Sequence, residues 1–250
     1  MEKRRQALVD LINQLGEVSM TQLRGLFPTV SEVTLRKDLR VLDEGNKIVR
    51  IHGGAKSIQD IIQNGSNFTM RTSLHQEEKF IIAQKAAPLV HPGCSIYISA
   101  GSTCAEFARQ LPDMASYIFT DGLVVAREIP FCPERYVEVF GGRLNQNLMR
   151  VIGPSVVSSI EKLHFDYAVL GAAGFHPDYG IPQTTSIISA IANAAISRAD
   201  KVIILMDSSK INYIHSSWNI PLQSVDVIVT DDHLPQQIRE LMESQGVTVL

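Results

Sequence analysis

The apolar residues at the start of the chain recur at the spacing of helices. The first predicted helix ends at Gly16, and four apolar residues recur along it at helical spacing: Leu8, Leu11, Ile12 and Leu15. The second predicted helix begins at the N-cap Ser19 and ends before Pro28. Three of its apolar side chains are expected to face inward: Leu23, Leu26 and Phe27. A third is capped by Ser31, ends at Gly45 and carries an apolar stripe at positions i, i+4 and i+7: Leu35, Leu39 and Leu42.

The third predicted helix has polar and basic side chains opposite its apolar stripe. At about 100° per residue, Val33, Lys37 and Arg40 point away from the stripe, and Thr34 and Arg36 lie on its flanks. Such a face fits the major groove of DNA, where Arg and Lys reach guanine edges or phosphates. The spacing alone is also consistent with a small helical subdomain whose basic face is solvated.

A predicted β-hairpin and an uneven charge distribution support the DNA-binding interpretation. Residues 47–51 predict a strand, residues 52–54 a turn and residues 55–58 the returning strand, which together form a wing. The first 56 residues carry a net charge of +3 and the remaining 194 carry −6, although the whole chain is only −3. A basic segment ahead of an acidic body favours a polyanionic partner such as nucleic acid.

Beyond residue 70, short apolar runs alternate with helical segments. Six runs predict strands: 95–99, 117–119, 136–140, 167–170, 202–206 and 225–229. Strands separated by helices pair mostly in parallel, with helices over both faces, so the sequence predicts an α/β fold. Ligands of such sheets bind beyond the carboxyl ends of the strands, where this chain has glycines, hydroxyls, Asp207 and Lys210.

The strand ends predict an anionic ligand. Gly101, Ser102 and Thr103 stand between a strand and a helix start, where free N–H groups, the helix dipole and two hydroxyls favour a negative group. Lys210 supplies a compensating cation, and a sugar phosphate suits this arrangement. The simpler interpretation of each loop is a tight turn that needs small residues. A dinucleotide site is disfavoured because no GxGxxG follows the first strand.

Several features disfavour other classes of protein. No apolar run approaches the roughly 18 residues of a membrane span, and Asp10 and Asn13 disfavour a signal peptide, so we expect a cytoplasmic protein without a membrane partner. Three cysteines without a CxxC pair fit a reduced compartment. The histidines lack metal-ligand spacing, and neither a metal nor a cofactor is expected. Trp218 is expected to pack rather than to line a pocket.

Two sets of residues carry a resemblance to a known family. In the N-terminal part they are residues 30–39, Leu42, Gly45, Arg50 and residues 52–55. In the body they are Glu78, Lys79, Ile82, Ala83, Pro92, Gly93, residues 101–103, Gly141, Gly142, Gly153, Asp166, residues 171–174 and residues 207–210. In these positions the chain resembles the DeoR family of bacterial transcriptional regulators over nearly its whole length.

The resemblance implies a division of the chain into three parts. Residues 1–57 are expected to form a winged helix-turn-helix DNA-binding domain, and residues 58–70 a linker. Residues 71–250 are expected to form an effector-sensing and oligomerisation domain that is similar in fold to ribose-5-phosphate isomerase. Members of the family usually sense a phosphorylated sugar with this second domain.

The sequence pattern and the resemblance together give two groups of candidate site residues. The candidates for DNA binding are Ser31, Glu32, Val33, Thr34, Arg36, Lys37, Arg40, Arg50 and His52. The candidates for effector binding are Ser99, Gly101, Ser102, Thr103, Thr120, Asp121, Gly141, Gly142, Gly171, Gly174, Asp207 and Lys210.

Three departures from the family pattern point to an atypical or weakened effector site. Ser99 stands where the family commonly has Asp, and Asp121 stands where Asn usually follows Thr. Residues 186–199 lack the Glu and Lys that the family usually has there. A carboxylate at Asp121 would repel a phosphate unless it contacts sugar hydroxyls instead.

Two classes of function remain. The first is a sequence-specific regulator, a repressor of a sugar-catabolic operon, which a phosphorylated sugar relieves or modulates. No residue sets the sign of control, and an activator is the weaker alternative within this class. The second is a sugar-phosphate isomerase with Asp207 as general base and Lys210 stabilising an enediolate. The wing and the basic helix favour the first and predict that the chain is not an enzyme. A single winged module reads only a few base pairs, so we expect a homodimer or homotetramer on double-stranded operator DNA.

Overall fold

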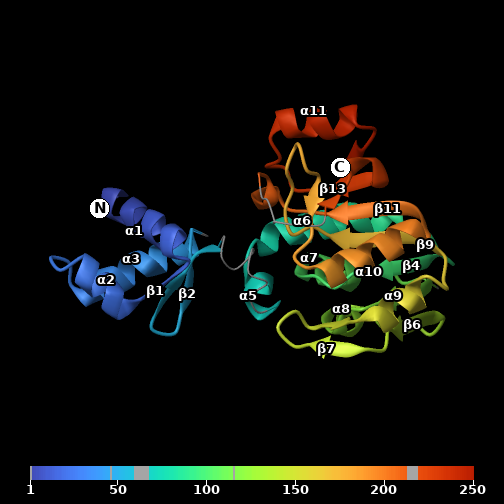
Figure 1. The fold of residues 1–250 in the computed structure, drawn as a ribbon, viewed down its shortest axis with the longest axis horizontal. Coiled ribbons are helices and arrows are strands. Elements are labelled where there is room, and N and C mark those ends of the chain that lie inside the picture. Colours follow the sequence, from blue (N-terminus) through green and yellow to red (C-terminus); the bar gives the residue numbers. More distant parts are fainter. Residues whose placement is uncertain (1, 46, 59–67, 115, 213–218) are drawn as a thin grey trace. The chain divides into compact units, whose positions relative to one another are not determined.

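A computed structural model describes the chain except for residues 1, 46, 59–67, 115 and 213–218. The chain forms two compact units, Met1–Leu74 and His75–Leu250, which we call the N-terminal unit and the C-terminal unit. Most of the predicted linker at residues 58–70 lies outside the described residues, and so does Trp218. Figure 1 labels most of the helices and many of the strands of both units.

The N-terminal unit contains the three predicted helices and the predicted hairpin. The helices are α1 (Glu2–Leu15), α2 (Met20–Leu26), α3 (Glu32–Glu44) and, after the hairpin, the short α5 (Phe68–Ser73). The strands are β1 (Glu17–Ser19), β2 (Val49–Ile51) and β3 (Gly54–Lys56). They form an antiparallel sheet in the order β1-β3-β2. The strand β1 was not predicted, because three residues are too few to show alternation.

Local signals explain where these helices begin and end. Gly16 adopts a positive φ of 75° directly after α1, a conformation that glycine takes without strain. Ser19 and Gln22 form a capping box at the start of α2, as the N-cap prediction for Ser19 requires. The prediction that Leu26 points inward is wrong, because this side chain is 56% exposed. Since α2 ends at Leu26, the next residue, Phe27, packs against the core in its place.

The C-terminal unit is built on a parallel sheet of seven strands in the order β14-β13-β11-β9-β4-β5-β6. The strands are β4 (Ser95–Ile98), β5 (Ser116–Thr120), β6 (Arg135–Val139), β9 (Phe165–Gly171), β11 (Ala199–Leu205), β13 (Val227–Val229) and β14 (Thr248–Val249). All six predicted runs are strands of this sheet. The α/β prediction is therefore confirmed.

Helices cover both faces of the sheet. One layer contains α6 (Gln76–Ala86), α7 (Ser102–Arg109) and α8 (Leu123–Glu128), which contact one another in turn. The other face packs against α9 (Pro154–Ile160), α10 (Ser186–Ser197) and α11 (Gln236–Ser244). Shorter elements are β7 (Arg143–Asn145), β8 (Arg150–Ile152), β10 (Ile181–Pro182), β12 (Asn219–Ile220) and the 3-10 turns η1 (Ala87–Leu89), η2 (Ser208–Lys210) and η3 (Leu222–Ser224).

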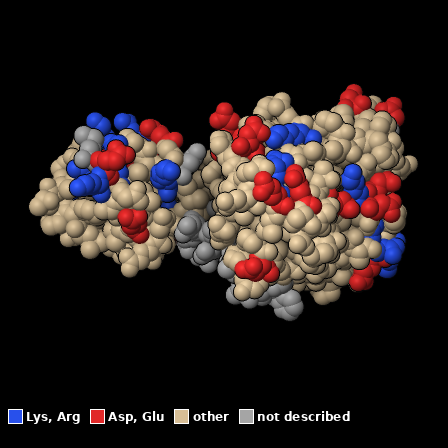
Figure 2. All heavy atoms as spheres, turned by 90° about the horizontal axis from the view of Figure 1, so that it is seen from above, with Lys and Arg blue, Asp and Glu red and all other residues tan. Residues whose placement is uncertain are grey.

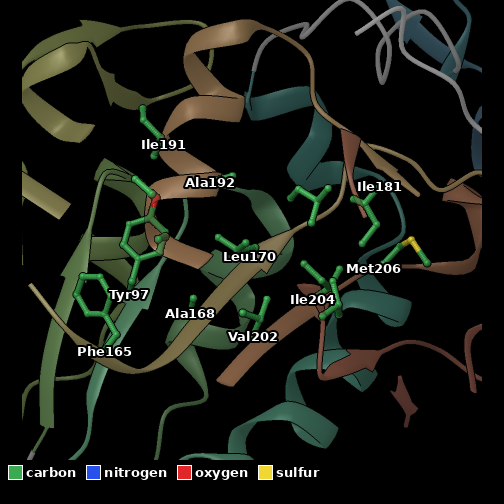
Figure 3. Close-up of a cluster of buried hydrophobic side chains, with 14 of the residues drawn as sticks. Tyr97, Phe165, Ala168, Leu170, Ile181, Ile191, Ala192, Val202, Ile204 and Met206 are labelled. Atoms are coloured by element: carbon green, nitrogen blue, oxygen red, sulfur yellow. The ribbon is translucent and has the colours of Figure 1, made fainter. Parts of the chain in front are cut away.

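The core of the C-terminal unit follows from alternation along the strands. Alternate side chains such as Ala168 and Leu170 of β9, and Val202 and Ile204 of β11, point to the same face. Figure 3 shows them in one buried cluster that also contains Ile191 and Ala192 of α10. This packing fixes the strands, and hence the positions of the loops at their carboxyl ends.

Candidate functional site

Helix α3 presents the predicted DNA-contacting side chains to solvent. The hydroxyl of Ser31 accepts a hydrogen bond from the backbone N–H of Thr34 at 3.2 Å, so Ser31 caps the helix as predicted. Its apolar stripe is buried in the core of the N-terminal unit: Leu35, Leu39 and Leu42. The side chain of Val33 is 78% exposed, and the basic side chains of the same face are also exposed: Arg36, Lys37 and Arg40. The helix is therefore anchored on one face and open on the other.

Carboxylates hold most of the basic side chains on this face. Glu32 accepts a hydrogen bond from Arg36 at 2.7 Å and lies 3.4 Å from Arg24 of α2. The hydrogen bond from Arg36 is the main reason that the pKa of Glu32 is lowered. Arg40 pairs with Glu44 at 3.7 Å. Figure 2 shows basic and acidic side chains side by side on the N-terminal unit. Among the described residues Lys37 has no ion-pair partner, so its ammonium group is exposed without a carboxylate that a ligand would have to displace.

The wing places Arg50 and His52 at the surface. The backbone N–H of Arg50 donates to the Asp43 carboxylate at 2.9 Å, which ties β2 to the end of α3 and leaves the Arg50 side chain exposed. His52 is exposed at the turn between β2 and β3. The turn ends at Gly54, where a Cβ atom would collide with the carbonyl of Val18. A glycine is therefore required for β3 to approach β1.

Asp38 is a structural residue of α3 that the sequence analysis did not single out. It is 2% exposed, and its two carboxylate oxygens accept hydrogen bonds from Arg4 at 2.6 Å and Arg5 at 3.0 Å. Because both arginines belong to α1, these bonds fix α3 against α1. Burial by itself raises the pKa of Asp38, but the hydrogen bonds and charges of the two arginines outweigh it and lower the pKa.

Asp38→Asn is expected to weaken the packing of α3 on α1 by about 1–2 kcal/mol, because hydrogen bonds to a charged group are lost. A carboxyl whose pKa is lowered by folding stabilises the fold above its unfolded pKa of about 3.9 and ceases to do so as the pH falls through the folded value. Hydrogen exchange of the α1 and α3 amides in the full chain measures the difference. The difference in protection between the variant and the wild type should be present at neutral pH and shrink in acid. Equal protection of the two proteins at neutral pH would contradict the structural role of Asp38.

The carboxyl ends of β4 and β9 form the switch point of the parallel sheet. From β4 the chain proceeds to β5 and β6 on one side, and then returns to β9 on the other side. Ligands of open α/β sheets bind at such a point. The Sγ atom of Cys104, in the first turn of α7, lies close to two predicted residues, 3.7 Å and 3.4 Å from where Cβ atoms of Gly101 and Gly171 would be. The loops after β4 and β9 therefore lie side by side.

The loop after β11 joins this group. Phe175, which follows Gly174, donates its backbone N–H to the carbonyl of Lys210 at 2.9 Å, and the N–H of Ala172 donates to the carbonyl of Leu205 at 3.3 Å. The N-terminus of α7 begins at Ser102, so its hydroxyl and free N–H groups are at the same edge. The structure thus brings together seven of the predicted effector residues: Gly101, Ser102, Thr103, Gly171, Gly174, Asp207 and Lys210.

Asp207 is a buried carboxylate, and one of its two oxygens accepts no hydrogen bond from the described residues. Its Oδ1 accepts from the Ser209 hydroxyl, and its Oδ2 lies 4.0 Å from Nζ of Lys210 without a hydrogen-bond partner in the described part of the chain. Burial would raise the pKa of Asp207, but the charge of Lys210, the Ser209 hydroxyl and the charges of His75 and Lys79 together lower it. Asp207 is therefore an anionic acceptor, suited to a hydroxyl of a ligand.

Asp121 and Thr120 lie at the end of β5 with their polar atoms already bonded. The Thr120 hydroxyl donates to the carbonyl of Ile98 at 2.6 Å and accepts from the N–H of Gly122 at 2.9 Å. Asp121 is fully buried. Its Oδ1 accepts from the Tyr97 hydroxyl at 3.1 Å and from the Ala100 N–H at 2.9 Å, and its Oδ2 accepts from two guanidinium nitrogens of Arg150.

Arg150 bears on the repulsion between Asp121 and a phosphate that the sequence analysis expected. It is 6% exposed on β8 and neutralises the carboxylate, so the repulsion expected between Asp121 and a phosphate is compensated from within. Burial and the neighbouring Asp121 raise the pKa of Tyr97, whose phenol remains a donor. No local signal in the sequence identifies Arg150, because its partner lies 29 positions away.

The remaining candidates occupy less central positions. Ser99 is buried at the end of β4, where its backbone N–H donates to the carbonyl of Val169 at 2.9 Å. Gly141 and Gly142 form an exposed turn before β7, and the carbonyl of Gly141 accepts from the Ser155 hydroxyl at 3.2 Å. Asp166, which the resemblance included, binds the backbone and hydroxyl of Ser95 at the opposite, amino-terminal edge of the sheet.

Comparison with known protein families identifies both units. Residues 4–60 match the DeoR-like helix-turn-helix domain, and residues 74–232 match the DeoR C terminal sensor domain. The chain belongs to the DeoR family. The DeoR-type regulator that the sequence resemblance predicted is therefore confirmed, with its helix-turn-helix in the N-terminal unit.

DeoR-family relatives match the chain over nearly its full length. An uncharacterised HTH-type transcriptional regulator, YulB of Bacillus subtilis, is 30% identical over 99% of this chain and 95% of its own. The transcriptional repressor GlcR of the same organism is 27% identical over 100% and 95%. The L-fucose operon activator of Escherichia coli is 30% identical over 92% and 94%.

Similar solved structures include ribose-5-phosphate isomerase A of Methanocaldococcus jannaschii, which has 18% identity, covers 54% of either chain and has a TM-score of 0.39. The initiation factor eIF-2B of Pyrococcus horikoshii has 17% identity, covers 65% of this chain and 66% of its own, and has a TM-score of 0.45.

Helix α10 contains most of the stretch at residues 186–199 that the sequence analysis named as a departure from the family pattern. It is capped by Thr185 and has no charged residue between Ser186 and Ser197. Arg198, which follows it, donates to the carbonyl of Leu163 at 2.7 Å. The described residues contain no cluster of potential metal ligands, and no described helix is long and apolar enough to cross a membrane.

Proposed function

We propose that this DeoR-family protein is a repressor of a sugar-catabolic operon and that a phosphorylated sugar modulates its operator binding. The observation that carries the proposal is the pairing of an exposed basic recognition helix with a separate sensor domain that has an anion-binding arrangement at its switch point. The relatives include the repressor GlcR, which supports repression, and the L-fucose operon activator, which acts in the opposite direction. In this function the protein needs no cofactor and acts in the cytoplasm as a homodimer or homotetramer.

The site geometry supports a specific set of effector contacts. The phosphate binds at the N-terminus of α7, where Ser102 and Thr103 offer N–H groups and hydroxyls, with Lys210 as the charged partner. A sugar hydroxyl donates to the open Oδ2 of Asp207. Asp121 contributes indirectly, because its bonds to Ala100 and Arg150 hold the loop after β4 in place.

The alternative function, a sugar-phosphate isomerase, is disfavoured by the state of Asp207. A general base works best when its pKa is near the operating pH. The surroundings of Asp207 lower its pKa instead, which makes it a weak base and a good hydrogen-bond acceptor. We therefore propose that the site binds a sugar phosphate without converting it.

Lys210→Ala is expected to weaken binding of the effector by at least about tenfold, because a charge-assisted contact to the phosphate is lost. Calorimetric titration of the full chain with a panel of sugar phosphates, each beside its free sugar, measures the affinities. Lys201→Ala is the matched control, since Lys201 is exposed at the opposite end of β11. A sugar that binds equally well without its phosphate, or equally well to Lys210→Ala, would remove the anion site from the proposal.

The regulatory half of the proposal is tested with the same ligand on DNA. A ligand shifts operator affinity only if it prefers one state of the protein, and typical couplings of about 1–3 kcal/mol correspond to changes of about 5- to 150-fold. A gel-shift titration with and without the sugar phosphate measures this change. Tight binding of the sugar phosphate with unchanged operator affinity would rule out its role as effector.

A further inference from the structure

A cavity of about 400 Å³ lies in the C-terminal unit beside β7, β8 and the starts of α9 and α10. It is lined by Arg143, Ile152, Gly153, Pro154, Ser155 and Ile187. None of these residues belongs to the switch-point site of Gly101, Asp207 and Lys210. The volume lies within the range of about 300–1,000 Å³ that is usual for small-molecule sites.

The only charge among the lining residues is that of Arg143. Its side chain is exposed and has no ion-pair or hydrogen-bond partner among the described residues. Every other described arginine of the C-terminal unit binds a carboxylate or a carbonyl: Arg109, Arg127, Arg135, Arg150, Arg198 and Arg239. An unpaired guanidinium at a cavity without a carboxylate is complementary to an anionic group, which it binds through two parallel hydrogen bonds.

The backbone that carries Arg143 is held firmly. Arg143 pairs with Ile152 in the antiparallel β7–β8 hairpin, so the charged residue of the cavity wall lies directly opposite one of its apolar residues. Gly142 precedes it with a φ of 159°, and a Cβ there would lie 2.9 Å from Val151. The Ser155 hydroxyl binds the carbonyl of Gly141 at 3.2 Å. These contacts fix the base of the Arg143 side chain toward the cavity.

Helix α10 contributes no charge to the wall of the cavity. Ile187 in its first turn lines the cavity, and no residue from Ser186 to Ser197 carries a charge. No acidic side chain of α10 therefore competes with a ligand for Arg143. The other walls, Ile152 and Pro154, are apolar and suit the carbon skeleton of a small molecule.

We propose that this cavity is a second ligand site, which binds a small organic anion. Its phosphate or carboxylate group binds Arg143, and its carbon skeleton packs against Ile152, Pro154 and Ile187. The sensor domain then has two anion sites made of different residues. One contains Lys210 and the other contains Arg143.

The test is calorimetric titration of the full chain with glycerol 3-phosphate, glycerate and uncharged glycerol. We expect at least one of the two anions to bind and glycerol not to bind. The anion that binds identifies the preferred headgroup. Arg143→Gln should weaken the affinity for that anion by at least about tenfold, because the charged contact is removed. Ile187→Trp should weaken it as well by filling the cavity.

Two controls keep the outcomes distinct. Arg127→Gln removes an exposed arginine that does not line the cavity and should leave binding unchanged. Lys210→Ala should also leave this anion bound, and that result separates the cavity from the switch-point site. The proposal is overturned if neither anion binds, if glycerol binds equally well, if Arg143→Gln binds as wild type does, or if Lys210→Ala abolishes the binding. If instead sugar phosphates bind Lys210→Ala as tightly as they bind the wild type, that result counts against the proposed effector site alone.

Discussion

Arg150→Leu is expected to lower the free energy of unfolding of the C-terminal unit by about 3–5 kcal/mol, the usual cost of leaving one member of a buried ion pair alone. Asp121 is fully buried, and two of the four hydrogen bonds to its carboxylate come from the Arg150 guanidinium. Burial alone would lower the pKa of Arg150, but the charge of Asp121 outweighs it and raises the pKa. Without Arg150 the carboxylate keeps only its bonds to Tyr97 and Ala100.

Urea unfolding of the full chain, followed by a probe in the C-terminal unit, measures the loss. The double variant Asp121→Asn with Arg150→Leu is expected to recover at least about 1 kcal/mol, because an asparagine still accepts from Ala100 and carries no charge. Arg127→Leu is the matched control on the exposed surface of α8. A stability of Arg150→Leu within about 1 kcal/mol of wild type would show that the pair does not hold this loop.

Lys37→Ala is expected to reduce operator affinity by about 5- to 150-fold if Lys37 contacts a base, the range that corresponds to about 1–3 kcal/mol. If it contacts a phosphate, the log–log dependence of affinity on salt should flatten by about one unit. Arg40→Ala is expected to act in the same direction with a smaller effect, because Arg40 already pairs with Glu44. Arg36 is likewise held by Glu32.

Gel-shift titrations at several salt concentrations, on an operator fragment selected from random-sequence DNA, measure both quantities. Lys162→Ala is the matched control, because Lys162 is exposed on the C-terminal unit after α9. The fold and the effector affinity should be unchanged in every variant. Wild-type affinity and salt dependence in both Lys37→Ala and Arg40→Ala would disprove the assignment of α3 as the recognition helix.

The sequence by itself determined the elements whose signals are local. Ser19 and Ser31 cap helices where predicted, since a cap needs only the two or three residues that follow it. The stripe of Leu35, Leu39 and Leu42 identified the buried face of α3 and hence its open face. The apolar runs identified the parallel strands, and the small residues after them indicated the ligand edge.

Only the tertiary structure decided which distant charges meet. Asp38 finds Arg4 and Arg5 across more than 30 positions, and Asp121 finds Arg150 across 29. Periodicity carries no information about such pairs, because they depend on how helices and strands pack against one another. For the same reason the sequence predicted repulsion at Asp121 and did not single out Arg143. Whether a charge is neutralised or left open to a ligand is a property of its neighbours in space, and the fold alone supplies them.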